Sequence, residues 1–217
     1  MLSANVCAAN YLLDNPGDGI YRNHETPSEE KLTNLRDFLL DFGLTLGGGS
    51  KPTVKDYGEI LKKIANRPDA HLLQTVLLRS MHQAAYSTKN LGHFGLAYSA
   101  YTHFTSPIRR YPDLMVHRAI KSQLDGKNLK INDIGAIALH CSATERTADD
   151  ATRDVESWLK CYFMQDKVGE SFWGTVAGVT GFGLFMELDD IYIEGLLHVT
   201  ELGNDYFTYD KARHAMV

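Results

Sequence analysis

A short segment between residues 101 and 118 combines aromatic, hydroxyl and cationic side chains at one predicted turn. Its sequence is YTHFTSPIRRYPDLMVHR, in which the letters TSP signal a turn that leads into a helix. Arg109 and Arg110 stand just before this helix, whose first N–H groups lack partners and attract anions. A guanidinium can bind two phosphate oxygens at once. The segment therefore predicts a phosphate-binding site.

A purely structural interpretation of the same residues stays open. The two arginines can pair with Asp113 or Glu145, and the aromatic side chains can fill the core. In that case the turn carries no chemistry. Glu145 itself can be an ordinary partner for neighbouring charges three or four residues away on an exposed helix.

An acidic cluster raises the question of a metal site. Asp149, Asp150 and Asp154 lie close together in the sequence, and phosphoryl hydrolysis commonly uses metal ions held by carboxylates. However, Arg146 and Arg153 alternate with these carboxylates. We therefore expect a solvated ion-pair network, and predict no metal ligands in this chain.

A second candidate site lies in the glycine-rich stretch near the C-terminal end. Residues 168–199 are rich in glycine and β-branched side chains, which predicts three short strands of a small β-barrel. Phe182 and Phe185 follow the turn signal at Gly181 with the spacing FGxF, and His198 lies on the next strand. Residues i and i+3 of a strand face opposite sides unless a bulge intervenes, so one phenylalanine can instead belong to the core.

Helical elements must position these residues. Apolar spacing and capping signals predict helices over about 2–13, 29–42, 53–66, 68–85, 112–125 and 132–162. A short strand is expected at about 21–24, and aromatic alternation predicts a strand-like segment over 92–104. We place a domain boundary near Gln165, where the composition changes. The fold class expected is α+β.

Composition excludes several classes of protein. The chain has 217 residues, 44% of them hydrophobic, and a net charge of −5, which is typical of an ordered globular protein and disfavours one whose whole surface binds nucleic acid. No apolar run approaches the roughly 20 residues that span a bilayer. Cys7, Cys141 and Cys161 are widely separated, and the first residues lack the pattern of a signal peptide. We expect a cytoplasmic protein without a membrane anchor.

Several motifs together resemble a known family. HFTSPIRRYPDL, preceded by GHFGLA, with LLRS, GGG-KP and TER-ADDATRDVESWLK elsewhere, is similar to the signature of the RNB family of exoribonucleases. The resemblance covers residues 1–164. It implies processive hydrolysis of single-stranded RNA from the 3′ end, with release of nucleoside 5′-monophosphates and Mg²⁺ as cofactor. It also implies that the full-length enzyme is a monomer.

The resemblance assigns roles to particular residues. By motif match, Arg109 contacts the scissile phosphate and Glu145 lies near the 3′-terminal nucleotide. The other residues around the turn are expected to contact RNA: His103, Phe104, Thr105, Ser106, Arg110 and Tyr111.

One part of the family pattern is missing from this sequence. Family members hold Mg²⁺ with a run of aspartates of the form D-x-x-x-x-x-D-x-D-D, which does not occur here. We therefore expect residues 1–165 to be the C-terminal part of the catalytic domain, without hydrolytic activity as an isolated chain. The alternative is a non-catalytic RNA-binding or adaptor protein that retains half of an RNB-like domain.

The C-terminal stretch resembles another family. Residues 166–217 are similar to the first part of the S-one RNA-binding domain, an OB-fold barrel. The resemblance implies that Phe182, Phe185 and His198 form a platform for RNA bases. A complete barrel has five strands, so we expect a truncated copy whose residues 204–217 are poorly ordered and contain no closing strand.

Overall fold

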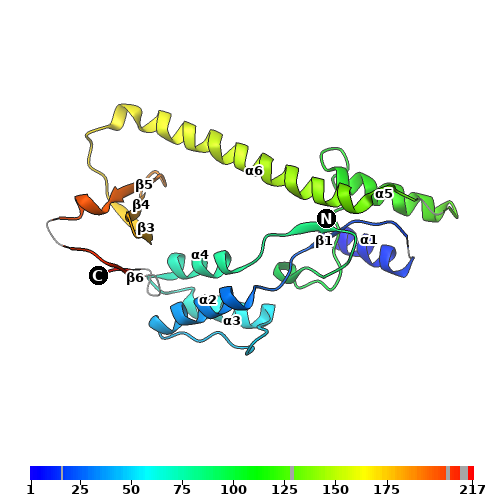
Figure 1. Ribbon diagram of the computed structural model, residues 1–217, viewed down its shortest axis with the longest axis horizontal. Coiled ribbons are helices and arrows are strands. Elements are labelled where there is room, and N and C mark those ends of the chain that lie inside the picture. The colour runs from blue at the N-terminus through cyan, green and yellow to red at the C-terminus, as the bar shows by residue number, and fades with distance from the viewer. Residues whose placement is uncertain (16, 128–129, 204–205, 211–214) are drawn as a thin grey trace. The chain divides into compact units, whose positions relative to one another are not determined.

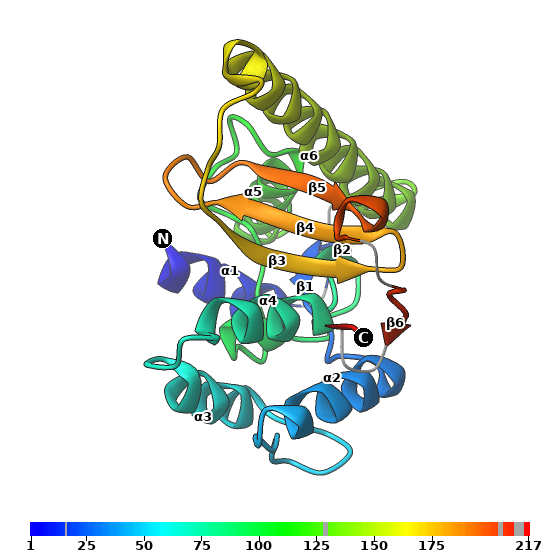
Figure 2. The same cartoon turned by 90° about the vertical axis from the view of Figure 1, so that its left-hand side faces the viewer.

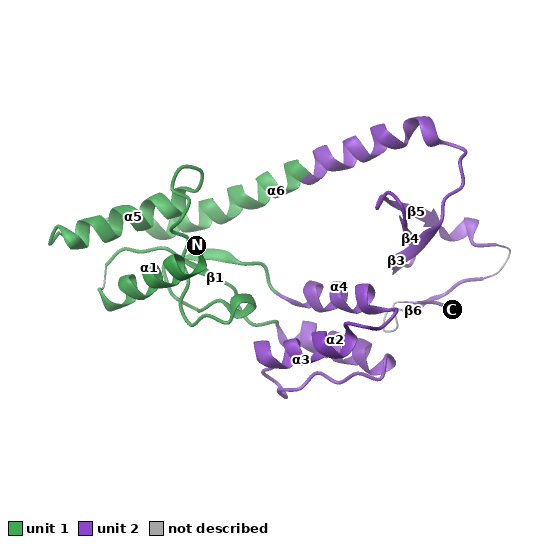
Figure 3. Cartoon of the chain, turned by 180° about the vertical axis from the view of Figure 1, so that it is seen from behind, with its two compact units in different colours: residues 1–27, 82–152 green, residues 28–81, 153–217 purple. Residues whose placement is uncertain are grey.

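The computed structural model describes residues 1–15, 17–127, 130–203, 206–210 and 215–217, which form two compact units. Unit 1 comprises residues 1–27 and 82–152, and unit 2 comprises residues 28–81 and 153–217 (Figure 3). Helix α6 (Ile134–Met164) is continuous over 31 residues and contributes to both units. Within the described part of the chain, no helix has the length and apolar character needed to cross a membrane.

Unit 1 combines helices with a small sheet (Figure 1). Its elements are α1 (Leu2–Asp14), β1 (Tyr21–Asn23), β2 (Ala85–Ser87), the 3₁₀ helix η1 (Phe94–Leu96), α5 (Tyr111–Leu124) and the first part of α6. Strands β1 and β2 are antiparallel, with Arg22 opposite Tyr86. Pro112 lies in the first turn of α5, where its missing N–H costs no helical hydrogen bond.

The core of unit 1 forms between helices that present small side chains. Ala8, Ala9 and Leu12 of α1 pack with Val116 and Ala119 of α5. A second buried group joins the strands to α6; its members are Ile20, Tyr86, Met115 and Ala138. Both groups fix the helices that flank the predicted phosphate site.

A buried amide anchors the chain that leads to this site. The side-chain NH₂ of Asn5 donates to the hydroxyl of Tyr101 at 2.9 Å, and its Oδ1 accepts from the backbone N–H of Phe104 at 3.1 Å. The hydroxyl of Thr102 donates to the carbonyl of Ile20 at 2.6 Å. Because these buried groups satisfy one another, residues 101–104 are held without regular secondary structure.

Unit 2 contains three helices and a sheet. The helices are α2 (Glu29–Asp41), α3 (Val54–Ile64) and α4 (Ala70–Ser80), and their buried side chains include Leu35, Phe38, Leu39, Ile60, Ile64, Leu73 and Leu77. Ser28 caps α2 by accepting from the N–H of Lys31. Gly43 ends α2 with a positive φ of 68°, as the sequence predicts.

The sheet of unit 2 is an antiparallel meander of three strands (Figure 2). Strands β3 (Gly174–Thr180), β4 (Gly183–Leu188) and β5 (Glu194–His198) pair in sequence order, with an irregularity between Val176 and Gly178. A Cβ on Gly183 would lie 2.3 Å from the carbonyl oxygen of Leu197, so only glycine fits there. The 3₁₀ helices η2 (Gln165–Lys167) and η3 (Val199–Glu201) flank the sheet in sequence.

The fold class is α+β, as predicted, but two predicted elements are wrong. Residues 92–104 form η1 and irregular chain, because Gly92 and Ala97 adopt positive φ angles of 78° and 58° that interrupt an extended strand. The helix expected over 68–85 ends at Ser80, since Ala85 begins β2 and pairs with Asn23 of β1.

The C-terminal prediction also needs correction. Strands β6 (Tyr209–Asp210) and β7 (Ala215–Met216) form a second, two-stranded sheet, where the sequence suggested no strand. Residues 204–205 and 211–214 of that prediction lie outside the described residues.

Replacing Asn5 with alanine tests the anchoring of residues 101–104. Asn5→Ala leaves the buried N–H of Phe104 without its acceptor, so the free energy of unfolding should fall by about 1–3 kcal/mol. The matched control is Asn10→Ala, on the exposed side of α1, which should change stability by less than about 0.5 kcal/mol. Urea unfolding followed by circular dichroism measures both, and equal losses would contradict the anchoring role.

Candidate functional site

The turn before α5 is organised around a fully buried carboxylate. Asp113 has 0% exposure, and its Oδ1 accepts from the backbone N–H of Ser106 and from Nη2 of Arg110, both at 2.8 Å. The carbonyl of Ser106 accepts from the backbone N–H of Arg110 at 3.1 Å. A buried charge requires such compensation, and the start of a helix adds to it. Arg110 is thus the counter-ion of Asp113, one of the two pairings that the sequence left open.

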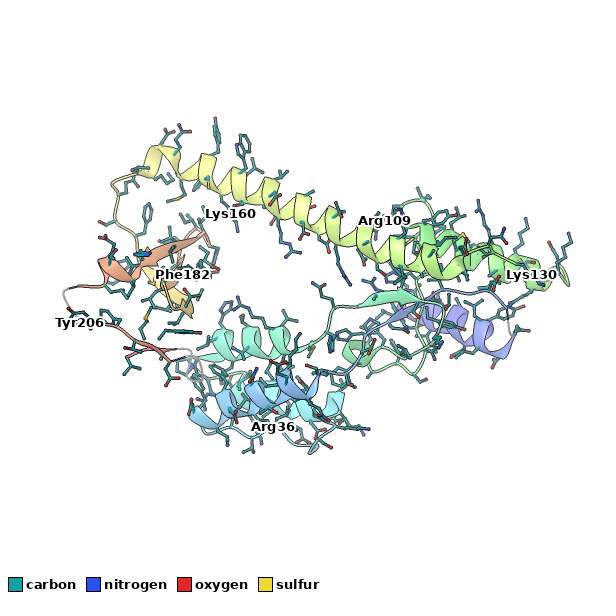
Figure 4. All side chains as sticks on the ribbon, viewed as in Figure 1. Arg36, Arg109, Lys130, Lys160, Phe182 and Tyr206 are labelled. Atoms are coloured by element: carbon teal, nitrogen blue, oxygen red, sulfur yellow. The ribbon has the colours of Figure 1, made fainter. Side chains whose placement is uncertain are left out.

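Arg109 differs from its neighbour. Its side chain is exposed, as is that of Ile108, at the outer part of the turn. Figure 4 shows Arg109 at this turn, outside the helices of unit 1. Of the two arginines, Arg109 is therefore the one available to a ligand.

Glu145 is paired with a residue from the other end of unit 1. Its Oε2 lies 2.6 Å from Nη1 of Arg22, which belongs to β1. The side chains are 34% and 13% exposed, respectively. Local spacing predicts a partner three or four residues away on the same helix. The ion pair instead joins Glu145 to Arg22, on a different element.

Tyr86 connects this ion pair to the turn. The guanidinium carbon of Arg22 lies 4.5 Å from the centre of the Tyr86 ring, a cation–π contact. The Tyr86 hydroxyl lies 2.8 Å from Nδ1 of His103. Burial, above all, raises the pKa of Tyr86 to about 12. The phenol therefore keeps its proton at neutral pH and can donate a hydrogen bond to Nδ1 of His103.

His103 is a neutral imidazole in this environment. Burial, and after it the positive charges of Arg110 and Arg22, lower its pKa to about 4. His93, 5.1 Å from His24 between ring centres, also has a pKa lowered to about 4, mainly by burial and then by His24. The site thus holds its positive charge on arginines, which do not titrate near neutral pH.

The remaining predicted residues of the turn have different environments. The ring of Phe104 stacks on His117, with 4.0 Å between centres, and packs against the core, so it is only partly available to a ligand. Thr105 is half-buried. Tyr111, the first residue of α5, is 47% exposed.

The second predicted site lies on the sheet of unit 2. Phe182 and Phe185 meet edge to face with 6.1 Å between ring centres, and Phe182 is 50% exposed (Figure 4). Phe185 pairs with Leu196, and Gly183 pairs with His198. Directly paired residues share a face of the sheet, and so do residues two apart on one strand. Phe185 therefore projects from the same side as Gly183 and its partner His198. Their spacing therefore agrees with a shared platform rather than with opposite faces.

The carboxylates present do not fit a magnesium site. Asp149, Asp150 and Asp154 are exposed on α6. Across the described residues, no three His, Cys, Asp or Glu side chains lie close enough to hold a metal ion. No chemical step in this chain is therefore assigned to a metal.

Three residues of the site were missed by the sequence analysis. Arg22, Tyr86 and Asn5 contact site residues that lie 123, 17 and 99 positions away. Local spacing does not reveal such contacts. One sequence signal was Arg22 itself, a charged residue in the middle of the short predicted strand.

The model of one protein family matches the chain. The RNB domain matches residues 1–126. Ribonuclease R of Escherichia coli is 48% identical over 97% of this chain and 28% of its own length. Ribonuclease R of Aquifex aeolicus is 38% identical over 100% of this chain and 31% of its own length. The chain thus spans less than a third of these relatives.

Comparison with solved structures also finds a ribonuclease R among the similar proteins. RNase R of Mycoplasma genitalium, in complex with ribose-methylated single-stranded RNA, has a TM-score of 0.90 and 29% identity over 100% of this chain and 35% of that one. The yeast pseudonuclease Ssd1 has a TM-score of 0.81 at 21% identity over 99% of this chain and 28% of that one, which indicates a shared fold alone.

The pKa of His103 provides a test of this site. Because its folded-state pKa of about 4 lies below the unfolded value of 6.5, the unfolded chain binds the proton more tightly. The contribution of His103 to stability is therefore present above pH 6.5 and is lost as the pH falls from 6.5 to 4.

The measurement is an NMR titration of the His103 ring in the folded chain and in urea. We expect a neutral ring at pH 6 in the folded chain only. In addition, His103→Asn should flatten the decline in unfolding free energy between pH 6.5 and 4. A folded-state pKa at or above 6.5 would contradict the assigned environment.

Proposed function

The chain belongs to the RNB family, and from this premise we propose that it forms the phosphate- and ribose-binding part of a 3′-to-5′ exoribonuclease of the ribonuclease R type. Residues 1–165 are then the C-terminal part of the catalytic domain, and residues 166–217 the first part of an S-one-type RNA-binding domain. The observation that carries the proposal is the division of labour between the two arginines: Arg110 neutralises buried Asp113, whereas Arg109 is exposed.

Arg109 supplies electrostatic stabilisation in this proposal. Phosphoryl hydrolysis builds up negative charge on the phosphate oxygens, and a fixed guanidinium stabilises that charge more in the transition state than in the ground state. The turn is fixed before RNA binds, because Asp113 holds both Ser106 and Arg110. Arg109→Lys keeps the charge but loses the paired hydrogen bonds.

Glu145 recognises ribose in this proposal. Its carboxylate is only partly exposed and can accept a hydrogen bond from a 2′-hydroxyl, a group that DNA lacks. The Mycoplasma genitalium RNase R structures with single-stranded and with double-stranded RNA support RNA as the ligand class.

The aromatic pair on the sheet supplies binding without sequence preference. Stacking on an aromatic side chain is worth about 1–3 kcal/mol per base for any base. This suits an enzyme that moves along RNA of every sequence.

We propose that the chain alone binds RNA but does not hydrolyse it. The aspartate run of the family is absent from the sequence, and the described carboxylates do not form a metal site. Mg²⁺, which would supply charge neutralisation and an activated water, is thus held in the longer enzyme by residues that this chain does not contribute.

The test uses 5′-labelled single-stranded RNA in Mg²⁺ buffer with the 217-residue chain. We expect salt-dependent binding and no release of mononucleotides. Arg109→Ala should weaken binding about equally for all sequences and reduce the slope of log affinity against log salt by about 1.

The matched control is Lys121→Ala, which removes an exposed cation from the last turn of α5. It should leave the affinity unchanged within about twofold. Mononucleotide release that Arg109→Ala abolishes would disprove the inactivity of the chain. Absence of salt-dependent RNA binding would disprove the proposed function. RNA binding that Arg109→Ala leaves unchanged would favour the adaptor alternative.

A separate prediction concerns the aromatic platform. Phe182→Ala should weaken RNA binding by about 1–3 kcal/mol, and pyrimidine and purine oligomers should lose similar amounts. Tyr192→Ala is the control, because Tyr192 is 71% exposed in the same unit and lies outside the platform. Fluorescence anisotropy with labelled oligomers measures both variants, and equal effects would argue against a specific platform.

A further inference from the structure

The carboxylate of Glu145 is held by one arginine from a distant part of the sequence. Nη1 of Arg22 lies 2.6 Å from Oε2 of Glu145, although 123 positions separate the residues. Among the hydrogen bonds of the described residues, those of Glu145 engage Oε2 only. The contact therefore fixes the side chain through Oε2, while Oε1 accepts no hydrogen bond from the described residues.

Arg22 is itself fixed on three sides. Its backbone N–H donates to the carbonyl of Tyr101 at 2.9 Å, and its position on β1 lies opposite Tyr86 on β2. Its guanidinium covers the Tyr86 ring at 4.5 Å, and its side chain is 13% exposed. A long side chain on the surface would adopt many rotamers, whereas this one has lost that freedom on folding.

Tyr86 links the same pair to α6 and to the turn. Its backbone N–H donates at 2.9 Å to the hydroxyl of Ser142, which lies three residues before Glu145 on α6. Its phenol contacts His103 at 2.8 Å, in the chain that leads to the arginine turn. One tyrosine thus connects the helix that bears Glu145 with the segment that bears Arg109.

We propose that Arg22 is a positioning residue for ribose recognition: held over the Tyr86 ring, it orients the Glu145 carboxylate toward the 2′-hydroxyl of the 3′-terminal nucleotide. This inference rests on the proposed function and adds to it the residue that sets the specificity for ribose. A carboxylate positioned in advance loses little rotamer entropy on binding, so its hydrogen bond contributes more to affinity. A merely structural ion pair would stabilise α6 without affecting the choice of sugar.

The test compares two single-stranded oligomers of one sequence, one ending in a ribose and one in a 2′-deoxyribose. Unmodified protein should prefer the ribose end by roughly tenfold, as expected for a hydrogen bond to a charged group. Both Arg22→Met and Glu145→Met, which removes the acceptor oxygens, should bring this preference to within about twofold of unity, while affinity for the deoxy-ended oligomer stays nearly constant. Arg22→Lys should restore part of the preference.

A variant changed at both Arg22 and Glu145 shows whether the two residues act together or independently. If Arg22 acts through Glu145, then Arg22→Met combined with Glu145→Met should lose no more preference than either change alone. The matched control is Arg67→Met, which breaks another arginine–carboxylate pair, to Asp69 at 2.7 Å, and should leave the preference intact. Arg22→Lys keeps a cation at the position and provides the result if Arg22→Met does not fold.

The outcomes distinguish this inference from the proposed function. If the unmodified chain binds RNA and prefers the ribose end, but Arg22→Met, or Arg22→Lys where Arg22→Met does not fold, retains that preference in full, the positioning role is wrong and the proposed function stands. If Glu145→Met, which has no acceptor oxygen, also retains it, the ribose contact is wrong as well. An unmodified chain that binds no RNA overturns both.

Discussion

The burial of one carboxylate determines the geometry of the site. Asp113 has no exposure, and a charge in that position is tolerable only if donors surround it. Ser106 supplies a backbone N–H and Arg110 supplies a guanidinium, and both lie on the turn that precedes α5. The turn is therefore drawn onto the start of the helix. The preceding residue, Arg109, makes no such contact, and its side chain is exposed to solvent. Adjacent residues of identical chemistry thus acquire different environments: Arg110 compensates a buried charge, and Arg109 remains exposed.

The second half of the site depends on contacts between distant segments. Glu145 lies on α6, a long helix most of whose residues are exposed. Without a partner from another element, it would be one surface carboxylate among several. The contact with Arg22 changes this, because β1 presents a guanidinium whose exposure is low and whose direction is fixed by Tyr86. The neutral state of His103 is part of the same arrangement: an imidazolium beside two arginines would add a third positive charge in a partly buried space.

The sequence predicted the elements with local signals and missed those decided by tertiary pairing. The caps at Ser28 and Pro112 and the long apolar pattern of α6 were readable, because helix signals are contained in a few turns. The alternation over residues 92–104 was misleading: its aromatic residues pack on other parts of unit 1, as Tyr101 does on Asn5, while positive φ angles at Gly92 and Ala97 prevent a strand. Motif resemblance indicated Arg109 and Glu145, but not Arg22, whose role depends on a partner 123 residues away.

The long sequence separation of these contacts also sets an order of assembly during synthesis. The Asn5–Phe104 and Arg22–Glu145 contacts close loops of 99 and 123 residues, and such closures are late and slow steps of folding. A ribosome releases the N-terminal part of a chain first. Helix α1 can meet α5, and β1 can meet β2, before α6 has emerged, whereas the Arg22–Glu145 contact must wait for α6. In a nascent chain, the Arg22 guanidinium therefore lacks its carboxylate partner until Glu145 has been synthesised.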